Sequence, residues 1–283
     1  MSDQPDDARI TTIQGQPVPS IGLGTWQLRG DSCRESVADA LSIGYRHLDT
    51  AQMYENEAEV AAGIADAGVD RDEIFLTTKL QLESLAADRV EPATDESLKR
   101  LDTDYVDLLL VHWPTDDVEW PATFEAMARV QEAGKARHLG VSNFTPEQVE
   151  RAADSGITVF CNQVEYHPLL AQPHICRQAQ EMDYLLTAYS PVARGKVDGE
   201  ITLKRIAAAH EKTPAQIALR WLIEQTNVVA IPKAASPEHR RANIDIFDFT
   251  LTEDEHEQIH QIDRGQRLVD PDFAPDWQRP ANS

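Results

Sequence analysis

Short apolar runs alternate with amphipathic stretches along most of the chain. The apolar runs are rich in Leu, Ile and Val and are bounded by polar residues, which is typical of buried parallel strands. The stretches between them carry apolar residues at helical spacing, as in 35–43, 57–68 and 123–134. This alternation predicts an α/β protein with a parallel sheet and helical crossover connections.

Eight strand–helix units are predicted after a leading hairpin over 10–24. The strands are expected at 44–49, 74–79, 105–112, 136–141, 159–164, 184–189, 228–232 and 244–248. Pro214 follows Thr213, so 202–225 is expected to hold two helices, the second starting at Thr213. An acidic helix over 251–263 then precedes a Pro/Asp-rich tail, from Arg264, that is expected to run as a C-terminal loop. Eight units in one domain over 1–283 predict a (β/α)8 TIM barrel.

A doubly wound nucleotide-binding fold is the main alternative. Such a fold normally has GxGxxG between its first strand and first helix. The chain contains one GxG, Gly22-Leu23-Gly24, and Thr25 and Trp26 follow it without a third glycine or a helix start. The absence of this fingerprint favours the barrel.

The charge of the chain is strongly negative. Asp and Glu number 48 and Lys and Arg 26, which gives a net charge of −22 over 283 residues. Self-repulsion of this size destabilises a compact chain unless salt screens it. A halophilic cytoplasm with molar salt would explain the charge, and so would a simple requirement for solubility. Nucleic acid and anionic membranes are poor partners for such a surface.

Targeting and metal-binding signals are missing from the sequence. Residues 1–10 are acidic and polar, without the basic-then-apolar pattern of a signal peptide, and no apolar run approaches the ~20 residues of a membrane helix. Cys33, Cys161 and Cys176 lie far apart without CxxC spacing, so neither a disulfide framework nor a zinc site is predicted. A cytoplasmic protein is expected.

Four reactive side chains lie at or near the ends of the first three predicted strands. Asp49, Lys79 and His112 each end a strand, and Tyr54 follows Asp49 after one turn. The carboxyl ends of strands carry the chemistry of α/β barrels. Carbonyl reduction needs a proton donor and a group that orients the oxygen, which a tyrosine and a histidine can supply. Because a nearby ammonium lowers the pKa of a phenol, Lys79 is predicted to tune Tyr54, with Asp49 holding the lysine.

Each of these residues alone also has a structural explanation. Asp49 can cap a turn, Tyr54 can pack, Lys79 can be a solvated strand end and His112 a structural histidine. Those explanations do not account for all four at one end of consecutive strands. A metallohydrolase using His47, Asp49 and His112 is a further alternative, because His47 and Asp49 share a strand face, but no second acidic or histidine cluster completes a metal site.

Further motifs occur in a fixed order along nearly the whole chain. They are GLGTW (22–26), LDTAQMYENEAEVAAGI (48–64), TTK (77–79), LLLVHWP (108–114), GVSNF (140–144), NQVEYHP (162–168), AYSP (188–191) and IPKA (231–234). In these motifs the chain resembles the aldo-keto reductase family, in particular its short-loop bacterial and archaeal aldehyde and 2,5-diketo-gluconate reductases. The resemblance implies an oxidoreductase that transfers a hydride from NAD(P)H to a carbonyl. Tyr54 would be the general acid, tuned by Lys79 and Asp49, and His112 would orient the carbonyl.

The resemblance also implies a set of cofactor-binding residues. Ser142, Asn143 and Gln163 match the residues that bind the nicotinamide amide, Tyr189 the ring that stacks on nicotinamide, and Ser190, Lys233, Ser236, His239 and Asn243 the rest of the cofactor site. The loop 190–196 would run along the pyrophosphate.

The adenosine end departs from the family pattern. Ala234, His239 and Ala242 stand where serine, arginine and glutamate are common, and Arg240, Arg241 or Ser236 are the candidates to replace the missing arginine. NADPH is expected, with NADH left open.

The substrate end is expected to have apolar walls. Trp26, Trp113 and Met53 are the candidates, and Trp277 either closes over them or lies on the barrel exterior. Small aldehydes, keto acids, dicarbonyls and aldoses all remain open as substrates. The resemblance favours a monomer without a metal. A nicotinamide-binding sensor or partner subunit with slow turnover is the alternative function.

Overall fold

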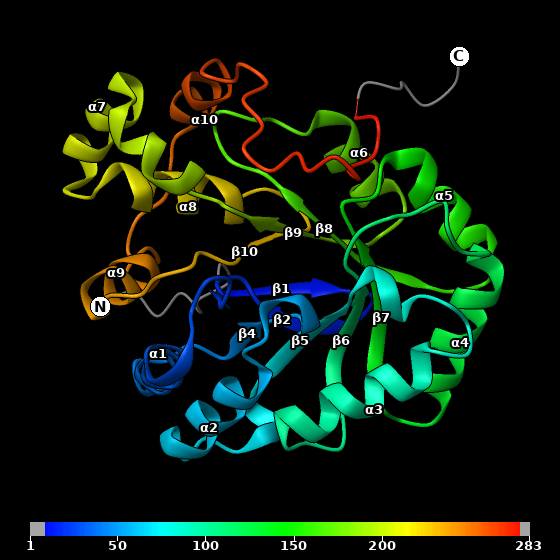
Figure 1. Cartoon of the computed structure of the whole chain (residues 1–283). Helices are drawn as coiled ribbons and strands as arrows, with labels where there is room; N and C mark the ends of the chain where they lie inside the picture. Colours follow the sequence, from blue (N-terminus) through cyan, green and yellow to red (C-terminus); the bar gives the residue numbers. More distant parts are fainter. Residues whose placement is uncertain (1–8, 278–283) are drawn as a thin grey trace.

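Eight parallel strands form one sheet that curls into a barrel, and helices surround it (Figure 1). The computed structural model describes residues 9–277; most of the acidic N-terminal stretch and the last six residues of the expected C-terminal loop lie outside this range. The strands are β3 (Leu23–Gly24), β4 (His47–Asp49), β5 (Phe75–Leu80), β6 (Val106–Val111), β7 (Ala136–Ser142), β8 (Val159–Glu165), β9 (Leu185–Tyr189) and β10 (Val228–Ala230). They lie side by side in sequence order, and a parallel bridge between Ile21 and Ala230 joins the first to the last. The predicted (β/α)8 TIM barrel is confirmed.

One helix of the barrel follows each strand, with two additional helices. In chain order they are α1 (Gly30–Ser42), α2 (Glu57–Ala67), α3 (Val90–Leu101), α4 (Trp120–Glu132), α5 (Pro146–Asp154), α6 (Pro173–Glu181), α7 (Ile201–His210), α8 (Pro214–Ile223), α9 (Pro237–Ile244) and α10 (Glu253–His260). The predicted pair over 202–225 is α7 and α8, and Thr213 caps α8 through a hydrogen bond from Gln216 N. The additional helices α7 and α10 contact each other, with His210 Nε2 2.9 Å from Glu255 Oε1.

The last predicted strand and the end of the predicted hairpin need correction, whereas the first predicted strand, 44–49, contains β4. Residues 244–248 form no strand: α9 ends at Ile244, and the following residues run as a connection in which Ile246 is buried. The missing strand is β3, which the sequence placed in the leading hairpin. A Cβ on Gly24 would lie 2.7 Å from the carbonyl oxygen of Ile231, so glycine lets the first strand approach the last. The Gly22-Leu23-Gly24 pattern therefore belongs to the seam of the barrel.

The leading hairpin closes the amino-terminal end of the barrel. It consists of β1 (Ile10–Ile13) and β2 (Gln16–Pro19), which pair antiparallel. Ile13 and Val18 are fully buried and pack in one cluster with residues from inside the barrel, namely Phe75, Leu108, Leu110, Phe160, Cys161, Leu185 and Val229. This apolar layer fills one end of the barrel and leaves the carboxyl ends of the strands for polar side chains.

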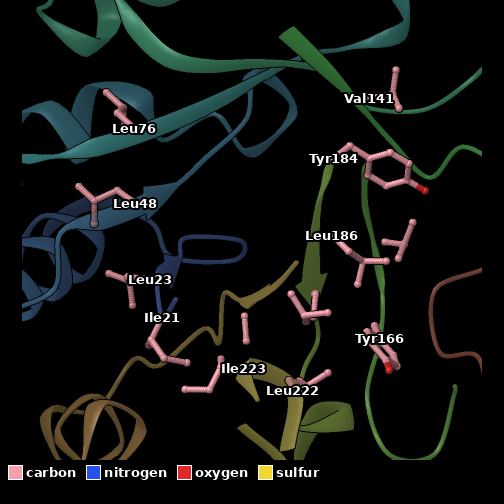
Figure 2. Packing of buried hydrophobic residues seen from close by; sticks show 14 of the residues in the cluster. Ile21, Leu23, Leu48, Leu76, Val141, Tyr166, Tyr184, Leu186, Leu222 and Ile223 are labelled. Atoms are coloured by element: carbon pink, nitrogen blue, oxygen red, sulfur yellow. The ribbon is translucent and has the colours of Figure 1, made fainter. Parts of the chain in front are cut away.

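Alternate residues of each strand face the barrel interior and the helices. On β5, Phe75 belongs to the interior cluster, whereas Thr78 donates to Glu57 Oε1 of α2 at 2.6 Å and so faces outward. Leu48, Leu76 and Leu186 belong to the larger apolar layer between strands and helices (Figure 2). The register therefore places Lys79, two residues beyond Thr77, inside the barrel at its carboxyl end.

Across residues 9–277, no helix is long and apolar enough to cross a membrane. Cys33, Cys161 and Cys176 are free, and they lie on α1, β8 and α6.

Candidate active site

A cavity of about 640 Å³ opens at the carboxyl ends of the barrel strands. Part of its lining comes from strand ends: Gly24, Asp49, His112, Ser142, Gln163 and Tyr189 each lie at or near the end of a strand. Tyr54 lies in a short 3₁₀ turn (Gln52–Tyr54) after β4, and Asn56 holds this connection by donating to the carbonyl oxygens of Thr25 and Leu28. All four predicted catalytic residues meet here, and three of them, Asp49, Tyr54 and His112, line the cavity.

Lys79 is the centre of a buried polar group. Its ammonium has three N–H donors, and its Nζ lies 2.5 Å from Asp49 Oδ1, 2.9 Å from the carbonyl oxygen of Thr50 and 3.4 Å from Tyr54 Oη. The other carboxylate oxygen of Asp49 accepts from Gln163 Nε2 at 2.7 Å. Because Tyr54 Oη can accept a hydrogen bond from Lys79, its own O–H is left to donate toward the cavity.

Burial dominates the electrostatics of this group. It raises the pKa of the Tyr54 phenol well above its usual value, and the Asp49 carboxylate adds to that rise. The predicted net lowering of the Tyr54 pKa is therefore wrong in direction. Burial also lowers the pKa of Lys79, while Asp49 opposes this by stabilising the ammonium. Tyr54 thus carries its proton at neutral pH, and Lys79 lies where it would stabilise a phenolate after proton transfer.

His112 faces Tyr54 across the cavity. The two rings meet edge to face with centroids 5.5 Å apart. Burial, with a smaller contribution from the charge of Lys79, lowers the pKa of His112 well below its usual value, so the imidazole is neutral at neutral pH. A neutral imidazole offers one N–H donor. Tyr54 and His112 therefore present two neutral donors to the same space.

The predicted amide-binding residues form one network. Asn143 donates through Nδ2 to the carbonyl oxygen of His112 at 3.0 Å, and its Oδ1 accepts from Tyr189 Oη at 2.8 Å. Ser142 Oγ donates to the carbonyl oxygen of Gln163 at 2.8 Å. Asn143 has φ 63, a left-handed conformation that asparagine tolerates better than most residues. The network ties the ends of β6 to β9 together around the cavity, and the contact of Gln163 with Asp49 is one that the sequence did not predict.

The comparisons with known proteins agree with this geometry. The profile of the Aldo/keto reductase family matches residues 20–264. The chain belongs to this family. An aldo-keto reductase of Mycolicibacterium smegmatis is 40% identical over 262 residues, which cover 92% of this chain and 95% of that one.

Two other relatives carry more specific names. Methylglyoxal reductase DkgB of Escherichia coli O157:H7 is 38% identical, with 92% and 99% of the two chains covered. A crystal structure of a putative 2,5-diketo-D-gluconic acid reductase B superposes with a TM-score of 0.94 at 40% identity, covering 97% of this chain and 99% of that one.

The predicted cofactor residues of this aldo-keto reductase fall into two groups. Ser142, Asn143, Gln163, Tyr189, Ser190 and Lys233 line the cavity. Ser236, His239 and Asn243 do not line it; they lie on or beside α9, which follows Lys233. Ser236 Oγ caps α9 by accepting from the backbone N–H of His239 at 3.2 Å. The structure therefore divides the candidates between the cavity and α9, where Ser236 is the N-cap, His239 lies in the first turn and Asn243 lies in the last turn.

Arg240 is not available to replace the arginine that is missing at the adenosine end. Its guanidinium is buried and donates to Asp39 Oδ2 at 2.6 Å, Ser36 Oγ at 3.1 Å and the carbonyl oxygens of Ala234 and Ala235. These contacts anchor α9 to α1. Arg241 is exposed, and its contact with Asp39 is longer, 3.7 Å, so Arg241 and Ser236 are the candidates that stay open.

The apolar walls of the reductase cavity include Trp26, Met53 and Trp113 as predicted. Trp277 meets the cavity residue Trp113, with ring centroids 6.5 Å apart, but does not itself line the cavity. The sequence did not predict the contribution of Phe273, which meets Trp113 edge to face at 5.4 Å.

Arg194 is another cavity residue that the sequence did not predict. Its guanidinium carbon lies 5.0 Å from the centroid of the Trp26 ring, and its φ of 52 is left-handed. The clustering of positive φ values at Ser190, Ala193 and Arg194 has no sequence signal apart from the neighbouring Gly195.

The metallohydrolase arrangement does not form. His47 Nδ1 lies 3.1 Å from the carbonyl oxygen of Pro19, and the chain from residue 9 to 277 contains no group of three His, Cys, Asp or Glu side chains placed to hold a metal ion.

Proposed function

We propose that this enzyme reduces aldehydes and ketones by hydride transfer from NADPH, with Tyr54 as the general acid. The observation that supports this most strongly is the buried triad in which Asp49 holds the Lys79 ammonium 3.4 Å from Tyr54 Oη, with the neutral His112 ring opposite. A protonated phenol and a neutral imidazole on one cavity wall are suited to binding one carbonyl oxygen.

Each residue has a defined part in this proposal. NADPH supplies the hydride when it is bound. His112 donates a hydrogen bond that orients the carbonyl oxygen, and Tyr54 transfers its proton to that oxygen. Lys79 then stabilises the phenolate, since its Nζ already lies within hydrogen-bond distance of Oη. Asp49 keeps Lys79 charged and in place despite burial.

The cavity also suits an extended, anionic nicotinamide cofactor. One part of its lining is the amide network around Asn143, beside Tyr189, and another carries the cations Arg194 and Lys233. For neither cation does the structure of residues 9–277 show an ion pair with a carboxylate. Arginine and lysine are the usual partners of phosphate groups. Arg241, in the last turn of α9, is the proposed contact for a 2′-phosphate, and NADH is left open as a second cofactor.

Small carbonyl compounds are the proposed substrates. The relative named methylglyoxal reductase DkgB and the structure titled as a putative 2,5-diketo-D-gluconic acid reductase B support a compound with more than one carbonyl group. The test is reduction of methylglyoxal with NADPH and, separately, with NADH, each carrying deuterium at both hydrogen positions of C4. The proposal predicts deuterium on the carbinol carbon of the product and a higher kcat/KM with NADPH. Absence of label from the product carbon with both cofactors would contradict it.

A further inference from the structure

Glu165 is a fully buried carboxylate outside the catalytic cavity. It ends β8, and its side chain has no solvent-exposed surface. Its carboxylate accepts from the backbone N–H of Leu268 at 2.9 and 3.0 Å and from that of Val269 at 2.9 Å. His167 Nε2, also fully buried, lies 2.9 Å from Glu165 Oε1. A buried carboxylate thus holds two successive backbone amides of the C-terminal segment.

The segment that Glu165 holds forms one wall of the cavity. Leu268, Val269, Asp270, Pro271 and Phe273 line the cavity, whereas Glu165 does not. We use the term C-terminal wall for residues 267–277. Since hydrogen bonds to a charged group are stronger than those between neutral groups, several of them on one carboxylate hold this wall more firmly than neutral turn contacts would.

Further contacts connect the segment held by Glu165 to the substrate end of the cavity. The guanidinium carbon of Arg267 lies 3.8 Å from the centroid of the Trp277 ring, and Trp277 Nε1 donates to Asp270 Oδ1 at 3.1 Å. Trp277 and Phe273 both meet Trp113. Trp113 directly follows His112, so the wall ends beside the residue proposed to orient the carbonyl.

We infer that Glu165 is a positioning residue that fixes the C-terminal wall against Trp113, and that it thereby determines how well carbonyl substrates with an aromatic group are accepted. This inference rests on the proposed reductase function. Glu165 does not contact the cavity, so it acts through Leu268, Val269 and the aromatic side chains beyond them. A small dicarbonyl needs only Tyr54 and His112, whereas an aromatic aldehyde also needs the wall that Phe273 and Trp277 form with Trp113.

The first test is Glu165→Gln, which keeps the shape of the side chain but places an NH₂ group against backbone N–H donors. The readouts are kcat and KM for 4-nitrobenzaldehyde and for methylglyoxal, the Kd of NADPH, and hydrogen exchange of residues 264–277. We expect the preference for the aromatic aldehyde to fall about 10-fold through KM. The Kd of NADPH and the kcat for methylglyoxal should stay within about twofold, and exchange of the segment should accelerate.

Two further variants keep the test decisive. Glu165→Asp keeps the carboxylate but withdraws it by one CH₂ from the N–H groups of Leu268 and Val269 without changing a cavity residue, and it should give the same selectivity change if Glu165→Gln fails to fold. In a Trp277→Ala background, Glu165→Gln should produce little further loss of selectivity, because both substitutions act through the C-terminal wall.

An unchanged preference for 4-nitrobenzaldehyde over methylglyoxal in a folded Glu165 variant would overturn the inference. An equal loss of kcat/KM for both aldehydes would overturn it as well. If the wild type reduces neither compound, the proposed function itself fails. The exchange rates of 264–277 then still show whether Glu165 holds the segment.

Discussion

At the residue scale, the chemistry depends on a lysine that has no exposed surface. Lys79 is kept in a buried site by Asp49, Thr50 and Tyr54, and its three N–H donors are matched by three acceptors. Removing one partner of a buried ion pair leaves the other charge uncompensated. A loss of activity after substitution of Lys79 alone therefore has two possible causes, and a matched variant is needed to separate them.

Lys79→Met should reduce kcat by at least about 100-fold, because the phenolate of Tyr54 loses its stabilising ammonium. The single variant should also lose about 3 kcal/mol of unfolding free energy, since Asp49 stays buried and unpaired. Asp49→Asn with Lys79→Met should recover most of that stability but none of the activity. Recovery of turnover in the double variant would show that Lys79 is structural. Denaturant unfolding and NADPH absorbance provide the two measurements.

His112 gives a prediction for the pH dependence. Its pKa lies well below the ordinary histidine value because burial and Lys79 disfavour the imidazolium. The neutral form should therefore persist as pH falls toward 6, and kcat/KM for carbonyl reduction should show no acidic limb near pH 6.5. A limb at that pH that disappears in His112→Gln would contradict the assignment of a neutral donor.

At the element scale, α9 is fixed to the barrel by Arg240. This side chain connects α9 with Asp39 and Ser36 of α1 and with the loop after Lys233, and Tyr45 Oη donates to the Arg240 carbonyl oxygen. Of the two arginines that the sequence suggested as cofactor contacts, Arg240 therefore has a structural role. Its burial distinguishes it from its exposed neighbour Arg241, a difference that the sequence alone does not reveal.

Arg240→Met should lower the free energy of unfolding by about 2–3 kcal/mol, less than for a fully buried pair because Asp39 is partly exposed. Arg241→Met is the matched control; its side chain is 60% exposed and pairs with the same Asp39, so its cost should stay within about 0.5 kcal/mol. Urea unfolding of both variants checks this. Equal losses would show that the buried network does not stabilise α9.

At the scale of the whole molecule, a net charge of −22 is the dominant feature. The ion pairs that the structure shows cannot neutralise it, because acidic residues outnumber basic ones by 48 to 26. Repulsion among exposed carboxylates falls as the screening length shrinks from about 10 Å at 0.1 M salt to about 3 Å at 1 M.

The Tm should therefore rise by several degrees between about 0.1 and 2 M KCl, because the screening length falls from about 10 Å to under about 3 Å over this range. Circular dichroism at a series of KCl concentrations gives the measurement. A Tm that does not change over this range would favour the simpler explanation, in which the charge only maintains solubility.

Much of the fold and of the catalytic group could be predicted because the signals are local. Asp49, Lys79 and His112 each end an apolar run, and the end of a strand also fixes where its side chain lies. β3 was misplaced because two residues carry no periodic signal. Residues 244–248 were misassigned because alternating apolar and polar residues also occur in an irregular connection that packs on helices, where Arg220 Nη1 donates to the Ile246 carbonyl oxygen.

The long-range contacts could not be predicted. Glu165 meets Leu268 and Val269 across 103 and 104 residues, and the partners on the C-terminal segment are backbone amides, which every non-proline residue offers. The net direction of the Tyr54 pKa was missed for a related reason, because burial outweighs the neighbouring ammonium and the degree of burial depends on the assembled barrel.

In the proposed reaction, Tyr54 supplies the proton to the carbonyl oxygen. The most direct test follows NADPH absorbance with methylglyoxal for the wild type and Tyr54→Phe side by side, with the Kd of NADPH measured for each. Tyr54→Phe should lower kcat by two or more orders of magnitude, in the range known for general-acid catalysis (about 10²–10⁴-fold), while the Kd of NADPH changes by less than about twofold. Equal turnover of the two proteins would show that Tyr54 is not the proton donor.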